Sequence, residues 1–334
     1  MLDKLFFSFN AILPIILIIL LGYVVKRIKL LPENFFPLLN RLCFYVCLPI
    51  LLFYNIYNVN NITEIVQNWK IVLFAILSIF VIFFLGLGFV TLWIKDNAQK
   101  GVVLQCIFRS NYVILGIPLA TTLAAGNSVS LAISSVLSAV VVPLFNVLAI
   151  LALSIFGKKE KLSVKNIIKK IITNPLIISV FVGIFALGFR ALLPSSAAGI
   201  KVFTIKNNLP FLYSSIEKIA NIASPIALIA LGGNFTFSAI PKLKIQIFSA
   251  TFIRLICVPS IFLGIAYFLD FNSNEFPALI ALFATSVAVS SVPMCEGIGG
   301  DTQLAGQLVV WTTVFSAITL FLIIFICTHI GIFV

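Results

Sequence analysis

The chain has 334 residues, of which 61% are hydrophobic and only 10% are charged, with a mean hydropathy of +1.20 and a net charge of +12. Soluble proteins are closer to half apolar and a quarter charged, so this composition excludes a large soluble domain. The positive charge does not indicate a nucleic-acid partner, because the basic residues lie in short loops between long apolar segments.

Ten apolar segments follow one another, each with about the twenty residues that cross a bilayer. We expect helices over residues 5–25, 36–57, 70–94, 101–125, 129–156, 173–193, 211–233, 246–269, 277–299 and 303–328. The predicted fold class is an all-α membrane protein with ten transmembrane helices. The first segment is followed by a basic cluster and preceded by little positive charge, so we expect a retained span and not a cleaved signal peptide.

Loops with lysine or arginine alternate with loops that have neither. The basic loops are 26–29, 95–100, 157–170 and 241–244, and the others are 58–69, 126–128 and 270–276. Basic loops are expected to face the cytoplasm, which places both termini outside a plasma (inner) membrane. Lys201 and Lys206, before the seventh helix, depart from the alternation.

The prolines indicate an internal repeat. Pro14, Pro32, Pro49 and Pro118 match Pro175, Pro194, Pro225 and Pro293 at separations of 161, 162, 176 and 175 residues. Each half then holds five helices, an odd number, so the second half enters the membrane inverted, as in many transporters. We expect a first repeat over 1–156, a basic cytoplasmic loop over 157–172 and a second, inverted repeat over 173–334. Chance spacing of the prolines is the alternative.

The fourth and ninth segments each carry a helix breaker, at Gly116-Ile117-Pro118 and at Ser290-Ser291-Val292-Pro293. Proline removes a backbone donor and clashes with the preceding turn, and the freed carbonyls cannot face lipid. The helix that restarts after a break presents N–H groups and a positive dipole, which suit an anion. The pattern predicts a substrate site that includes Gly116, Pro118, Ser290, Ser291 and Pro293.

Polar residues near these breaks are the other candidates. Ionisable groups inside a span are costly and usually face a watered or paired site. Arg109 and Asn111 are candidates for substrate binding, and Glu296 for an ion or coupling role. The alternatives are that Arg109 extends to the cytoplasmic interface, that Asn111 only bridges helices, and that Glu296 lies at a helix end or pairs with lysine. Further polar positions, with either a path-lining or a structural role, are Asn55, Ser138 and Asn146.

The sequence has no pattern for a metal, a cofactor or covalent catalysis. Its six cysteines lie in apolar segments without a C-x-x-C pair, and its one histidine, His329, has no partner near it in sequence. The aspartates lie in loops or at helix ends, so an intramembrane enzyme lacks a catalytic pair. A receptor would not need prolines at matched positions. Both remain remote alternatives.

Five stretches carry a family resemblance. They are LPIILIILLGYVVKRIKLLPENFFPLLNRLCFYVCLPILLF from Leu13, NYVILGIPLA from Asn111, NPLIISVFVGI from Asn174, SPIALIALGGNF from Ser224 and GGDTQLAGQLVVWTTVFSAITL from Gly299. In order and spacing they resemble the auxin efflux carrier family, which includes bacterial permeases and the plant PIN auxin exporters. The resemblance covers nearly the whole chain.

The resemblance implies a fold similar to that of the bile acid–sodium symporters, with the fourth and ninth helices crossing at their breaks beside the substrate pocket. Asn111 and Pro118 match the crossover motif, and Pro293 matches it more loosely. The chain departs from the PIN exporters in two ways. They carry a serine soon after the proline that matches Pro49, where this chain has Ile50, and they have a long hydrophilic loop that this chain lacks. These departures weigh against auxin, and the bacterial relatives suggest dicarboxylates such as malonate or malate by analogy.

We therefore expect a secondary transporter, a permease or efflux carrier, that moves a small organic anion by alternating access. A sodium-coupled symporter is the alternative, with Ser290, Ser291, Glu296 and unwound carbonyls as sodium ligands. The expected partners are the anion and membrane lipid, and a homodimer is left open.

Overall fold

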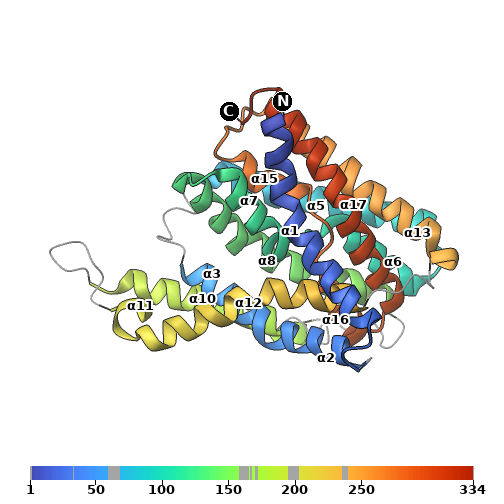
Figure 1. Ribbon diagram of the computed structural model, residues 1–334, viewed down its shortest axis with the longest axis horizontal. Coiled ribbons are helices and arrows are strands. Elements are labelled where there is room, and N and C mark those ends of the chain that lie inside the picture. Colours follow the sequence, from blue (N-terminus) through green and yellow to red (C-terminus); the bar gives the residue numbers. More distant parts are fainter. Residues whose placement is uncertain are drawn as a thin grey trace.

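The computed structural model is built of helices (Figure 1) and describes residues 2–32, 34–58, 68–157, 165, 168, 169, 172–194, 203–234 and 240–333. Its uninterrupted long helices are α1 (Leu2–Arg27), α5 (Trp69–Trp93), α8 (Ser128–Phe156), α10 (Pro175–Leu192), α12 (Pro210–Asn234) and α17 (Thr302–His329). One short helix, α11 (Ile205–Asn208), precedes α12. Most of the expected loops 58–69 and 157–172 lie outside the described residues.

Two further long helices contain a π-helical turn. The first runs through α2 (Phe35–Leu42), η1 (Cys43–Cys47) and α3 (Leu48–Tyr57), and the second through α13 (Ile240–Phe252), η4 (Ile253–Cys257) and α14 (Val258–Phe268). In each case the π turn ends two residues before a proline, Pro49 or Pro259. Proline clashes with the carbonyl four residues earlier, and a turn that contains one extra residue moves that carbonyl away.

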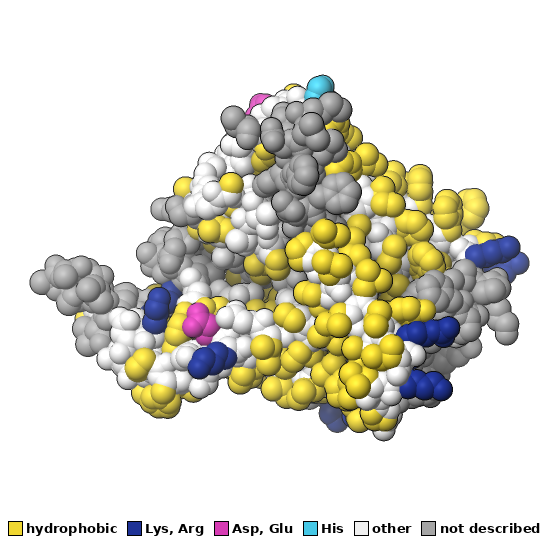
Figure 2. Space-filling model, viewed as in Figure 1, with side chains coloured by type: hydrophobic (Ala, Val, Ile, Leu, Met, Phe, Trp, Pro, Cys, Tyr) yellow, Lys and Arg dark blue, Asp and Glu magenta, His cyan; other side chains and the backbone are white. Residues whose placement is uncertain are grey.

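The outer surface of the helices suits lipid. Seven helices within the described residues are long and apolar enough to cross a membrane: 35–57, 69–93, 129–156, 175–192, 210–234, 243–268 and 302–329. Large apolar side chains point outward from them, among them Phe185 at 75% exposure and Phe268 at 83%. Figure 2 shows apolar side chains over much of one face. The predicted all-α, multi-pass membrane protein is confirmed.

Two segments consist of half-helices separated by non-helical residues. In one, α6 (Asn97–Phe108) is followed by residues 109–111, the π turn η2 (Tyr112–Gly116) and α7 (Ile117–Ala124). In the other, α15 (Phe276–Phe283) is followed by residues 284–290 and α16 (Ser291–Ile298). We call residues 109–111 the first break and residues 284–290 the second break.

Both breaks were predicted, but their expected positions are wrong by several residues. The backbone leaves the helix before Gly116-Ile117-Pro118, and before most of Ser290-Ser291-Val292-Pro293. Pro118 follows the π turn η2 by two residues, as Pro49 and Pro259 follow η1 and η4. Pro293 is the third residue of α16. The first turn of a helix has no internal partners for its N–H groups, so a proline there loses no hydrogen bond. Pro293 therefore lies in the first turn of its half-helix, whereas Pro118 lies inside the other half-helix, where the π turn before it accommodates the ring.

The helices pack in two groups. The first group consists of α1, α2–α3, α10 and α12, which contact mainly one another. The second group consists of α5, the half-helices α6, α7, α15 and α16, and the helices α8, α13–α14 and α17. Figure 1 shows α2, α3, α10 and α12 along one side of the molecule. Each group contributes one side of the cavity described below.

Helices α1 and α12 approach so closely at two glycines that their main chains are in contact. A Cβ atom added to Gly22 would overlap the Ile229 carbonyl, and one added to Gly232 would overlap the Ile19 carbonyl. Close approach through small residues is a common way for membrane helices to associate, because it increases van der Waals contact where no hydrophobic driving force exists.

Gly232→Ala tests this contact. The added methyl group has no space, so we expect a loss of roughly 1–3 kcal/mol in the free energy of unfolding, as in other overpacked cores. Gly264→Ala in α14 is the matched control, because a Cβ atom added there would enter open space. Thermal unfolding of the two purified variants gives the comparison. Equal melting temperatures would contradict the proposed contact.

The two kinds of loop gather at opposite ends of the molecule. At one end, Lys70 Nζ donates to the Leu269 carbonyl at 3.1 Å, and Asn127 Nδ2 donates to Asn274 Oδ1 at 2.8 Å. At the other end, Asp301 N donates to the Ala98 carbonyl at 3.0 Å. Non-basic loops therefore share the first end, and the loop that contains Lys95 lies at the second.

Cysteine labelling tests this arrangement. The two ends of α5 are separated by its 25 residues, or about 37 Å at 1.5 Å per residue. We expect an impermeant maleimide to label Lys95→Cys and Ser273→Cys from opposite faces of the membrane. Lys70→Cys is the control and should label from the same face as Ser273→Cys. Labelling of positions 95 and 273 from one face would refute the arrangement.

Candidate functional site

The two breaks cross and hydrogen-bond to each other. Asn111 N in the first break donates to the Ser286 carbonyl in the second at 2.8 Å, and Ser110 pairs with Val287 in an isolated antiparallel bridge. Val287 N donates to Thr312 Oγ1 of α17 at 3.2 Å. Unwound backbone inside a membrane must find hydrogen-bond partners within the protein. Here each break supplies such partners to the other. The crossing of the fourth and ninth segments, implied by the resemblance, is present.

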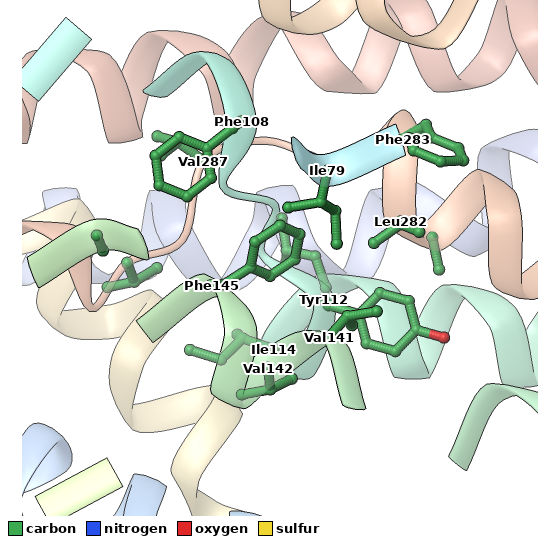
Figure 3. Close-up of a cluster of buried hydrophobic side chains, with 14 of the residues drawn as sticks. Ile79, Phe108, Tyr112, Ile114, Val141, Val142, Phe145, Leu282, Phe283 and Val287 are labelled. Atoms are coloured by element: carbon green, nitrogen blue, oxygen red, sulfur yellow. The ribbon is translucent and has the colours of Figure 1, made fainter. Parts of the chain in front are cut away.

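Apolar side chains surround this crossing (Figure 3). The Phe145 ring of α8 lies 6.2 Å, centroid to centroid, from the Phe108 ring at the end of α6. The Tyr112 hydroxyl, at the edge of the cluster, donates to the Ser134 carbonyl at 3.1 Å. Polar groups in such surroundings interact more strongly than in water, and unpaired ones cost more.

Arg109, the first residue of the first break, points into the protein and is 2% exposed. Its Nη2 atom donates to Asn146 Oδ1 at 2.6 Å and to Ser290 Oγ at 2.8 Å, and its Nη1 atom lies 2.9 Å from the sulfur of Met294. These partners belong to α8, the second break and α16. The side chain therefore joins three elements at the crossing and does not extend to the interface.

Among the described residues, the hydrogen-bond partners of Arg109 are all neutral. They satisfy individual N–H groups but do not balance the positive charge. A buried cation without a counterion is expensive, and inside a membrane such a group marks a functional site.

Two amide groups beside Arg109 have unused donors. Arginine can only donate, so Asn146 must turn its oxygen toward Arg109 and its Nδ2 atom away. That Nδ2 atom and the Nδ2 atom of Asn111 are both buried, and among the described residues neither has a hydrogen-bond partner. Buried donors left unpaired cost about 1–3 kcal/mol each, so they favour a ligand that brings acceptors.

A cavity of about 40 Å³ lies at this point, between the two helix groups. Its polar side is formed by residues of the second group: Arg109, Ser110, Asn111, Asn146 and Ser290. Leu48, Leu52 and Leu176 of the first group face them. A space of this size holds a few water molecules. With a cation and two free amide donors on one side, the site is suited to an anion that presents several oxygens.

The predicted site residues divide between this cavity and its surroundings. Arg109, Asn111 and Ser290 line it. Gly116 is buried where η2 packs on α15, since a Cβ there would lie 3.2 Å from the Ala281 carbonyl. Ser291 is buried and Pro293 half-buried in α16, whereas Pro118 is exposed in α7.

The remaining candidates are not brought to the cavity. Asn55 is half-buried in α3, and Ser138 is buried in α8. Glu296 is exposed in α16, two residues before that helix ends at Ile298. The candidates that lie in the breaks therefore line the cavity, and Asn55, Ser138 and Glu296 do not.

Two residues at the crossing were missed or undervalued. Asn146 was left open between a structural and a path-lining role, and it proves to be the closest partner of Arg109. Arg254 in η4 was not singled out, although it is fully buried and donates to the Thr285 carbonyl in the second break at 2.9 Å. A lone cation within the apolar segment 246–269 is the signal that could have found it, by the reasoning applied to Arg109.

The comparisons with known proteins agree with a membrane role. A family model described as membrane transport protein matches residues 7–324. This match includes both breaks and every residue that lines the cavity. A search of curated proteins finds no match to the chain.

Arg109→Gln tests whether this cavity binds an anion. Glutamine still offers a donor to Asn146 or Ser290 but carries no charge. We expect affinity for a small dicarboxylate such as malonate to fall about 10- to 100-fold, the range for a hydrogen bond to a charged group. The melting temperature without ligand should stay level or rise, because an uncompensated buried charge is removed.

Arg190→Gln is the matched control, since Arg190 is half-buried and donates to the Tyr57 carbonyl away from the cavity. Arg109→Lys should retain part of the affinity, because the positive charge stays while the planar guanidinium, which can donate two parallel hydrogen bonds, is lost. Calorimetric titration of purified protein gives the affinities. An unchanged affinity in Arg109→Gln would make Arg109 a structural residue.

Proposed function

The chain belongs to the membrane transport protein family, the family of the auxin efflux carriers, and we propose that it is a secondary transporter of a small organic anion. The observation that carries the proposal is the uncompensated Arg109 cation beside two unpaired amide donors in a cavity between two helix groups. The match of the family model to residues 7–324 confirms the predicted family, and a membrane transport role follows from it.

The chemistry of the cavity supports a carboxylate as the bound group. A carboxylate has two oxygens and about four acceptor positions, which match the Arg109 guanidinium and the free Nδ2 atoms of Asn111 and Asn146. No permanent acid competes for these donors among the residues that line the cavity. Dicarboxylates such as malonate or malate are the first substrates to test, by analogy with bacterial relatives.

The two helix groups support an alternating-access mechanism. The cavity has one side from each group, so a displacement of one group against the other widens it. A volume of about 40 Å³ is too small for a whole dicarboxylate with its water. We propose that binding requires the groups to part on one side of the membrane, and that release requires them to part on the other.

Ten spans in two inverted repeats form part of the same proposal. The fourth element of each half is broken, and the long helices α8 and α17 follow the two broken segments. We propose repeats over 1–156 and 173–334, joined by the basic loop 157–172. With basic loops in the cytoplasm, both termini lie outside the plasma (inner) membrane. The two termini lie close together at one end in Figure 1, as an even number of spans requires.

Sodium coupling and catalysis are less well supported. Of the proposed sodium ligands, Ser290 already accepts a hydrogen bond from Arg109, and Glu296 is exposed outside the cavity. A cation site there would also lie beside the positive charge of Arg109. Among the described residues at the crossing, no nucleophile is paired with a base, so we propose transport without covalent chemistry.

Asn111→Leu tests the proposed site. Leucine keeps the approximate volume but removes the donor that is unpaired in the cavity. We expect saturable binding of malonate, or of another anion found in an uptake screen, to fall at least about tenfold. Pro118→Ala should have little effect, because Pro118 is exposed and does not line the cavity.

Both variants are compared with wild-type protein at matched thermal stability. Binding is measured on purified protein, and uptake in proteoliposomes with labelled mono- and dicarboxylates. Near-normal affinity in Asn111→Leu would refute the site, whatever happened to the transport rate. Failure of the wild-type protein to bind or move any of these anions would refute the substrate class.

A further inference from the structure

A second buried arginine lies on the side of the crossing formed by η4. Arg254 is 0% exposed. Its Nε atom donates to the Thr285 carbonyl at 2.9 Å, its Nη2 atom to the Leu282 carbonyl at 3.1 Å, and its Nη1 atom lies 3.5 Å from the Ile107 carbonyl. Every one of these partners is a main-chain oxygen.

The three carbonyls mark the ends of two half-helices. Ile107 is in the last turn of α6, which ends at Phe108, and Leu282 is in the last turn of α15, which ends at Phe283. Thr285 belongs to the second break. The guanidinium of Arg254 therefore touches both half-helices at the point where each one stops.

The charges at this point balance. A helix C-terminus carries a partial charge of roughly −0.5, so two such ends together offer about −1. The guanidinium carries one positive charge and has five donors in a planar fork, which suits several carbonyls at once. Arg254 is thus compensated by main-chain dipoles, whereas the hydrogen-bond partners of Arg109 among the described residues are neutral side chains.

Half-helix C-termini and unwound carbonyls are a place where transporters with broken helices bind a coupling cation. In this chain the guanidinium of Arg254 occupies that place. We propose that Arg254 is a resident cation, a positioning residue whose charge holds the ends of α6 and α15 together, so that no dissolved cation is needed there.

This inference rests on the proposed function only for its consequence in transport. The crossing places Arg109 and Asn111 directly after α6, and Ser290 at the end of the second break. If Arg254 fixes where α6 and α15 stop, it also fixes the distance between the two sides of the anion site. Loss of its charge should then weaken anion binding without any direct contact between Arg254 and the anion.

Chemical rescue distinguishes a charge from mere filling of space. Arg254→Ala leaves a pocket lined by carbonyls that a free guanidinium ion can enter. We expect guanidinium chloride, at concentrations far below those that unfold proteins, to raise the melting temperature of purified Arg254→Ala relative to choline chloride. Wild-type protein and Arg190→Ala should show no such rise. An equal response in all three proteins would overturn the proposal.

Arg254→Lys and Arg254→Met provide a second comparison if the alanine variant does not fold. Their side chains are similar in length and differ in charge. We expect the methionine variant to lose about tenfold in malonate affinity and the lysine variant clearly less, since an ammonium still makes charge-assisted hydrogen bonds to carbonyls. Equal affinities and equal melting temperatures in the two variants would contradict a role for the charge.

Ion replacement completes the test. Anion uptake into wild-type proteoliposomes should be the same in sodium and in choline buffers, and a requirement for sodium would overturn the claim that the cation is resident. If wild-type protein binds no anion while guanidinium still stabilises Arg254→Ala, the proposed function fails and the resident cation stands.

Discussion

The arrangement at the crossing depends on how a positive charge is balanced in surroundings that exclude water. Arg254 lies among carbonyls at the ends of α6 and α15, and two helix dipoles offset its charge. Arg109 lies on the other side of the same breaks, among an amide, a hydroxyl and a thioether. Main-chain dipoles balance the charge of Arg254, and we propose that a bound anion balances the charge of Arg109. In this proposal the first arginine is structural and the second binds the ligand.

The unwound backbone makes this division possible. A continuous helix consumes its own carbonyls and N–H groups, so it offers no main-chain partner to a side chain in mid-membrane. At the crossing, Asn111 N and the Ser286 carbonyl satisfy each other, while the carbonyls of Leu282 and Thr285 remain available to Arg254. The breaks therefore create the crossing itself and also the surroundings of Arg109 and Arg254.

The apolar lengths, the loop charges and the helix breakers predicted most helices to within a few residues. They also singled out Arg109, Asn111 and Ser290, which line the cavity. The exact position of the first break was not predictable, because it depends on η2 and on how a π turn accommodates Pro118, which the apolar pattern does not encode. The role of Asn146 was equally hidden. Its distance of 37 positions from Arg109 in the chain becomes a 2.6 Å hydrogen bond only through the packing of α8.

Besides the hydrogen bond from Arg109 to Ser290, the contact between the breaks is made by main-chain atoms, through the Ser110–Val287 bridge and the bond from Asn111 N. Such a joint is largely indifferent to which side chains project from it. Side chains that line the cavity can therefore be exchanged during evolution while the main-chain contact at the crossing persists. A lineage of carriers with this architecture can acquire new substrates by small steps at the cavity, and its members can come to differ in cargo while they share one frame.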